Sequence, residues 1–138
     1  MINLSKYLIT IIFLISFIFA QTNYDSGSLP FTKNSLTAIP ITISDAGTIT
    51  DLNVKVKFDH DRIQGLFYTT LTLISPYGTA VVLGQGTAFS GEWNSNDGSQ
   101  LYSTVFDDEA AKSIYDGSPP FAGSFKPAES LSAFDKES

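Results

Sequence analysis

Carboxylates are the chemistry-bearing side chains that stand out in this chain, and three of them lie together in Asp107-Asp108-Glu109. Carboxylate oxygens are ligands for a hard cation such as calcium, which takes about six to eight of them. An aspartate oxygen also accepts the free amide hydrogens at the start of a helical turn. The acids therefore have two interpretations: capping and solvated turn carboxylates, or a calcium site that includes Asp107 or Asp108. The further acids that folding could bring beside them are Asp51, Asp59, Asp61 and Asp116.

The sequence shows no arrangement of residues that is typical of nucleophilic catalysis. A serine hydrolase needs a base within hydrogen-bond reach of its nucleophile, and His60, flanked by Asp59 and Asp61, is the single histidine. No Gly-x-Ser-x-Gly elbow accompanies it. The lack of cysteine excludes a thiol nucleophile and a zinc site built on thiolates. We therefore expect no catalytic machinery in this chain, and calcium is the one cofactor that the pattern suggests.

Aromatic side chains offer a second kind of site. Trp93, Tyr77 and Tyr102 could form a platform for a sugar or a protein, because an aromatic face presents a large apolar area with little entropy lost on binding. Trp93 lies in a polar loop from Gly84 to Gln100, where it is either exposed for contact or tucked over an edge of the fold. Other aromatic residues alternate with small or polar ones and are expected in the core: Phe106, Phe121, Phe125 and Phe134.

The elements that must position these residues are strands. Apolar and polar side chains alternate from Thr50 to Phe58, which is the period-two pattern of a strand with one buried face. A second strand is expected from Tyr68 to Ile74, and the turn Ser75-Pro76-Tyr77-Gly78-Thr79 leads back into Ala80 to Leu83. A further strand is expected from Leu101 to Phe106. Asp107 or Asp108 is then expected to cap a short helical turn through Ile114.

The first twenty residues predict export. Lys6 gives a positive start, an apolar run continues to Phe19, and Ala20 offers a small residue before a cleavage point. We expect residues 1–20 to be a signal peptide and the protein to be secreted or held in the cell envelope, with a membrane as partner only if the signal stays uncleaved. The formal net charge of −6 would repel phosphate backbones, so nucleic acid is not an expected partner. Residues 21–36 indicate a polar leader segment, and the composition favours an all-β class.

The order of the motifs resembles a known secreted module. The matching pieces, in sequence order, are Gly47 to Val56, His60, Leu71 to Thr79, Phe106 to Ala110, Pro120 to Pro127 and Leu131 to Phe134. A single piece such as Ser-Pro-x-Gly-Thr is weak, since any hairpin could use it. Their succession resembles the P domain, also called P/Homo B, of kexin- and furin-like subtilases and of bacterial secreted proteins. The resemblance covers residues 37–138 and implies a jelly-roll-like antiparallel β-sandwich.

The chain departs from that family in two places. In the convertases the P domain comes after a protease domain, whereas here the expected signal peptide leads almost directly into it. The family pattern also continues with a Gly-x-Trp strand, an acidic turn and a final strand after the last matched motif. We therefore expect residues 37–138 to be a C-terminally truncated domain without its closing strands. A fragment or a truncated gene model is the favoured explanation, and a protein that itself lacks the closing pair is the alternative.

The resemblance implies a non-catalytic module that stabilises or docks onto a partner, which is a subtilisin-like protease domain or another extracellular protein. Serine endopeptidase activity and proteolysis are then properties of the family's full proteins. The matching histidine, His60, sits at a strand end in the family and is not catalytic there. The alternative is an extracellular module that binds carbohydrate or a surface protein through the loop that contains Trp93.

Overall fold

The computed structural model describes residues 22–30, 35–58, 68–86 and 101–138. The chain divides into two units, Met1–Asp45 and Ala46–Ser138. The described residues of the first unit form neither helix nor strand. The second unit holds five strands and short 3-10 turns, and no α-helix occurs among its described residues. The expected all-β class is therefore confirmed, and the second unit carries it.

Three strands form one sheet in the order β1-β4-β5. β1 (Val54–Phe58) pairs antiparallel with β4 (Leu101–Phe106), and both segments were expected to be strands. β5 (Gly123–Phe125) pairs parallel with β4, with Val105 opposite Ser124. The expectation of a wholly antiparallel fold is wrong at this pair. A parallel neighbour needs a crossover, and residues 107–122 supply it.

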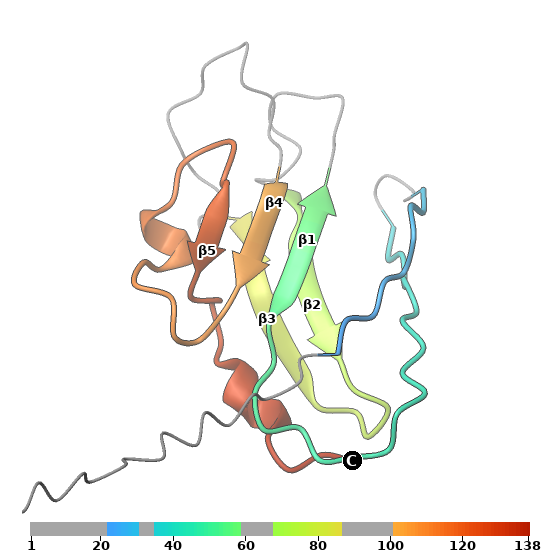
Figure 1. The fold of residues 1–138 in the computed structure, drawn as a ribbon. Coiled ribbons are helices and arrows are strands. Elements are labelled where there is room, and N and C mark those ends of the chain that lie inside the picture. The colour runs from blue at the N-terminus through green and yellow to red at the C-terminus, as the bar shows by residue number, and fades with distance from the viewer. Residues whose placement is uncertain (1–21, 31–34, 59–67, 87–100) are drawn as a thin grey trace, which may run out of the picture. The chain divides into compact units, whose positions relative to one another are not determined.

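The other sheet is the predicted hairpin (Figure 1). β2 (Thr70–Ile74) and β3 (Ala80–Gln85) pair antiparallel, and the register shifts between Leu71 and Thr72 so that β3 carries one extra residue. Gly78 takes a φ of 91° in the connecting turn, a backbone state that glycine adopts without steric cost. Ser75 closes the turn, because its amide donates to Thr79 O and its carbonyl accepts from Gly78 N.

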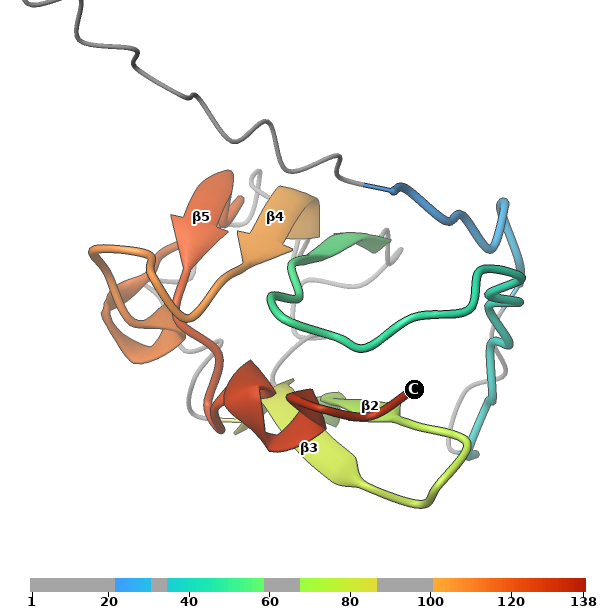
Figure 2. The same cartoon turned by 60° about the horizontal axis from the view of Figure 1, so that its bottom comes forward.

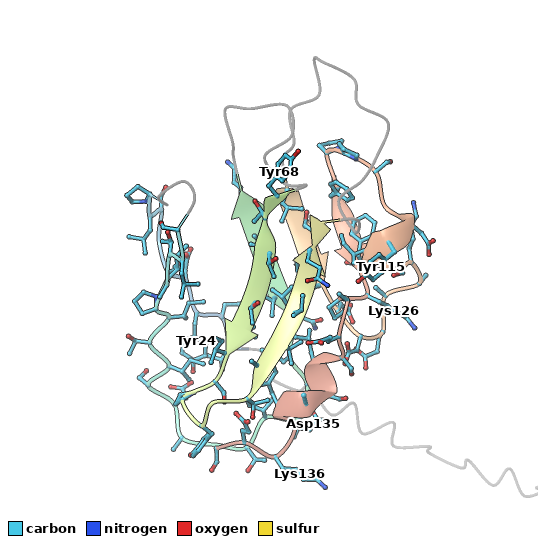
Figure 3. All side chains as sticks on the ribbon, turned by 180° about the vertical axis from the view of Figure 1, so that it is seen from behind. Tyr24, Tyr68, Tyr115, Lys126, Asp135 and Lys136 are labelled. Atoms are coloured by element: carbon cyan, nitrogen blue, oxygen red, sulfur yellow. The ribbon has the colours of Figure 1, made fainter. Side chains whose placement is uncertain are left out.

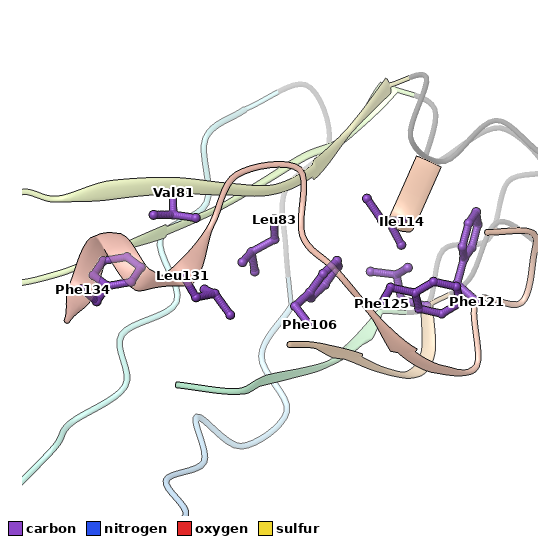
Figure 4. Close-up of a cluster of buried hydrophobic side chains, with 9 residues drawn as sticks. Val81, Leu83, Phe106, Ile114, Phe121, Phe125, Leu131 and Phe134 are labelled. Atoms are coloured by element: carbon purple, nitrogen blue, oxygen red, sulfur yellow. The ribbon is translucent and has the colours of Figure 1, made fainter. Parts of the chain in front are cut away.

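Both sheets contribute side chains to one core (Figure 4). Val81 and Leu83 point into it from β3, Leu101 and Phe106 from β4, and Phe125 from β5. The inner faces of β1 and β2 pack against the same cluster through partly buried residues: Val54, Val56, Leu71 and Leu73. All four phenylalanines expected in the core are buried there. Figure 2 shows β4 and β5 on one side and β2 and β3 on the other.

The segment after β4 differs from the expected helical turn. Residues 107–112 form no helix and contain turns and bends, and the 3-10 turn η3 (Ile114–Asp116) begins only where the helix was expected to end. Its cap is Ser113, whose side chain accepts from Tyr115 N. The buried Ile114 side chain anchors η3 in the core. The aspartates at 107 and 108 therefore do not cap this element.

The last residues run along β3 and end beside Ile49. Ala128 N donates to Leu83 O and Glu129 N donates to Val82 O, so this segment lies on the free edge of β3. The 3-10 turn η4 (Leu131–Phe134) comes next and buries its first and last side chains in the core. Ile49 then exchanges backbone hydrogen bonds with Lys136 and Glu137. The C-terminal segment thus packs as an integral part of the second unit.

Candidate functional site

Asp107 and Asp108 lie directly after β4, where Phe106 is fully buried and holds the strand end in place. The Asp107 amide donates to Phe125 O, which extends the β4–β5 contact by one residue. The Asp107 side chain turns back on its own segment, because its Oδ1 accepts from Glu109 N at 2.8 Å. Ala110 N closes the same turn on Asp107 O. Asp107 is therefore a turn carboxylate.

Asp108 caps a helical turn, but a distant one. Its carboxylate accepts from Ser130 Oγ at 2.6 Å, Leu131 N at 3.1 Å and Ser132 N at 3.0 Å. These two amides belong to the first turn of η4, where N–H groups have no partner within the helix. Burial would raise the pKa of Asp108, but the hydrogen bonds from these residues and the charge of Lys126 hold it below its ordinary value. Asp108 therefore caps a helical turn as expected, but the turn is η4 and not the segment that leads to Ile114.

A small open pocket lies beside this cap, with a cavity volume of about 50 Å³. It is lined by carboxylates and by the residues around them: Thr50, Asp51, Leu52, Asp108, Glu109, Leu131, Ser132 and Asp135. That volume is below the range of roughly 300–1,000 Å³ for sites that enclose a drug-sized ligand. The pKa of Glu109, which lines the pocket, is raised first by a hydrogen bond with the Asp107 side chain and to a lesser degree by the negative charges of Asp51 and Asp107.

The described acidic side chains are not arranged as a calcium site. Folding does bring Asp51 to the pocket beside Asp108, as we expected that it could, but Asp116 lies in η3 and does not line it. Within the described parts of the chain, no three acidic or histidine side chains come together in a way that could hold a metal ion. Asp108 already accepts three hydrogen bonds. A calcium site at Asp107 or Asp108 stays a prediction, which melting in calcium against magnesium can test.

Several sequence-predicted residues lie outside the described ranges. These are Trp93, His60, Asp59 and Asp61, together with nearly all of the expected loop from Gly84 to Gln100. Tyr77 is described and 68% exposed, in the turn between β2 and β3. Its hydroxyl donates to Ser138 O, which ties the ring to the C-terminal segment.

Sequence reasoning missed three residues of this site. Ser130 and Ser132 supply donors to Asp108, and Asp135 completes the acidic lining of the pocket. A signal was present for the serines, because Ser-x-Ser at the start of an apolar run is typical of a helix cap. The link from Ser130 to Asp108 spans 22 residues, and no local pattern announces a contact at that separation.

No helix among the described residues is both long and apolar enough to cross a membrane. Comparison with protein-family models, with curated proteins and with solved structures found no match. The function of the chain is therefore argued from its own residues.

Proposed function

We propose that this chain is a non-catalytic extracellular module of the P-domain type, which binds and stabilises a folded partner. The expected partner class is a subtilisin-like serine protease domain. One observation carries the proposal: the succession of P-domain-like motifs from Gly47 to Phe134. The proposal also includes the finer fold, in which the two sheets are the layers of a jelly-roll-like β-sandwich.

The places of the motifs in the fold support this proposal. The Ser-Pro-Tyr-Gly-Thr piece is the turn of the β2–β3 hairpin, and Gly47 to Val56 leads into and forms β1. The later pieces contribute Phe121, Phe125 and Phe134 to the core. Motifs that serve as turns and core residues specify a scaffold. In the described parts of these motifs no set of reactive side chains comes together, which favours binding over catalysis.

The mechanism rests on thermodynamic linkage. A module that binds the folded state of a partner, and not its unfolded state, lowers the free energy of the folded state by RT ln(1 + [L]/Kd). At a concentration of about 100 times Kd this amounts to about 2.7 kcal/mol. The formal net charge of −6 favours a partner with a basic surface and speeds the encounter with it.

The test measures stabilisation of a protease domain. A subtilisin-like catalytic domain that has been separated from its own P domain is heated with increasing amounts of the purified chain. We expect its melting temperature and its half-life at fixed temperature to rise in a saturable way. An unrelated acidic protein of similar size and charge is the control, because it reproduces the charge without the fold.

Three outcomes would overturn the proposal. A melting temperature that is the same with either protein removes the protease partner. Saturable binding to an oligosaccharide, lost in Trp93→Ala, would instead establish the carbohydrate-binding alternative. A peptidase assay on the chain alone belongs to the same experiment, since activity abolished by His60→Ala would show a self-sufficient hydrolase.

A further inference from the structure

The two sheets of the second unit have four outer edges, and three of them are protected. An edge strand presents unpaired backbone groups to any other strand, so proteins shield it with charge, bulges, short length or a covering segment. β1 carries Lys55 and Lys57. Its edge is therefore protected by charge.

The edges of β5 and β3 are covered by other segments. β5 is three residues long, and the backbone of Lys112 and Ile114 hydrogen-bonds to Lys126 at its end. On β3, Ala128 and Glu129 bond to the backbone of Leu83 and Val82, and the Glu129 carboxylate also accepts from Val82 N at 2.8 Å. Neither edge is open to a further strand along its length.

The described residues of the second unit show none of these protections on β2. It is the other edge of the two-stranded sheet, and no strand in the described part of the second unit lies on its outer side. It has five residues, Thr-Leu-Thr-Leu-Ile, with neither charge nor proline, and the extra residue of the hairpin falls on β3. Thr70, Thr72 and Ile74 are exposed on its outer face, with Ile74 64% exposed. Figure 3 shows this sheet from outside, with Tyr68 just before β2.

β2 lies in the longest stretch of the chain without a charged side chain. No charged side chain occurs from residue 63 to residue 91, although the chain carries 14 acidic and 8 basic side chains. Two copies with a net charge of −6 repel each other wherever their carboxylates meet. The residues of β2 and of its hairpin add no charge of their own to a contact between two copies. We propose that β2 pairs with β2 of a second copy of this chain, antiparallel and centred on Thr72.

The sequence of β2 is self-complementary in that arrangement. A two-fold axis at Thr72 places Thr72 opposite its own copy, Leu71 opposite Leu73, and Thr70 opposite Ile74. The leucines of both copies stay on the inner face, because a two-fold axis perpendicular to a sheet preserves its faces. The outer face then carries pairs of β-branched residues, which are favourable cross-strand neighbours. The result is a continuous four-stranded sheet, β3-β2-β2-β3.

The proposed interface is small, so the association is weak. One strand pair of five residues buries less than the roughly 1,200 Å² that marks a standard stable interface. The oligomeric state must therefore be followed across a wide range of protein concentration. Sedimentation velocity of the purified chain is the appropriate measurement, and we expect a reversible monomer–dimer equilibrium.

Three variants test the site. Thr72→Lys places two like charges opposite each other at the axis and is expected to raise the dimer dissociation constant by about tenfold or more. Thr72→Val keeps a β-branched residue and should leave the dimer intact. Ser124→Lys adds the same charge at an exposed strand position in β5 and should also leave it intact. Hydrogen exchange provides a readout on the wild-type chain, since the β2 amides should gain protection with concentration while those of β1 do not.

Three results would overturn the inference. The first is a wild-type monomer at all concentrations, which would show that β2 does not pair with a second copy. The second is a dimer equally weakened by Ser124→Lys and Thr72→Lys, which would place the contact elsewhere. The third is concentration-independent protection of the β2 amides, which would show that a strand of the same chain occupies this edge. None of these depends on the protease partner.

Discussion

The Asp108 carboxylate joins two segments that are far apart in the sequence. It comes directly after β4 and accepts hydrogen bonds from Ser130, Leu131 and Ser132 at the start of η4. Side-chain caps of this kind are worth about 0.5–2 kcal/mol in other proteins. Glu109, one residue later, is fully exposed and its pKa is raised, chiefly by Asp107. Adjacent carboxylates thus differ because one has donors beside it and the other has acids.

Replacing Asp108 by asparagine should destabilise the second unit by about 1–2 kcal/mol at neutral pH, because the charged acceptor of three hydrogen bonds is lost. The pKa of Asp108 is lowered in the folded state, so its stabilisation is present above the ordinary value of 3.8 and is lost as pH falls through the folded-state value. The difference in unfolding free energy between wild type and Asp108→Asn should therefore be constant above about pH 5 and shrink below it. Urea unfolding at several pH values measures it.

The control is Asp116→Asn, which removes an exposed carboxylate of η3. We expect it to change the unfolding free energy by less than about 0.5 kcal/mol. A pH-independent loss in Asp108→Asn would contradict the charged cap.

The crossover from β4 to β5 has little regular structure beyond η3 and is held by close packing. Phe121 is fully buried with a φ of 51°, and its carbonyl accepts the hydroxyl hydrogen of the buried Thr104. Gly117 lies against the Phe121 ring. A Cβ at Gly117 would stand 2.8 Å from Phe121 Cδ1. The parallel strand pair thus depends on a glycine that leaves room for an aromatic ring.

Gly117→Ala is therefore expected to lower the unfolding free energy by about 1–3 kcal/mol, the usual cost of overpacking a core. Thermal and denaturant unfolding both report it. Gly47→Ala is the matched control, because a Cβ there meets nothing within 4 Å and Gly47 is not among the positive-φ residues. Equal effects of the two substitutions would show that Phe121 moves aside freely.

The second unit as a whole is a small acidic molecule whose core is shared by two sheets. Its stability comes from packing in the absence of disulfides, since the chain has no cysteine. A metal ion bound only to the folded state would add to that stability. In the described residues Asp107 stabilises a turn and Asp108 caps η4, so both carboxylates have structural roles that need no ion.

We expect the melting temperature of the chain to be the same in millimolar calcium as in magnesium at the same ionic strength. Both ions screen the net negative charge equally, so their difference isolates specific binding. The opposite result would be a rise in melting temperature in calcium alone that a chelator reverses and that Asp107→Asn lacks. It would establish the calcium site at Asp107 or Asp108 and show that these carboxylates do more than cap and close turns.

Much of the fold could be predicted, because its signals are local. Period-two alternation located β1 and the first half of the hairpin, and the turn residues placed the reversal between β2 and β3. Phe106, Phe121, Phe125 and Phe134 were correctly expected in the core. Strand ends were less accurate, since β1 begins at Val54 and not at Thr50. At strand ends the pattern continues after the pairing partner has ended.

The amino-acid sequence by itself determined the all-β class, the hairpin, the core phenylalanines and the acidic charge. Each depends on residue type or on spacing within a few positions. Only the tertiary structure decided that β5 pairs parallel with β4 and that Asp108 caps η4. It also decided that the C-terminal segment covers the edge of β3, whereas no described strand of the second unit covers the edge of β2. These are contacts between segments many residues apart. Hydrogen bonding and burial select these contacts when the whole unit folds, so local sequence patterns do not predict them.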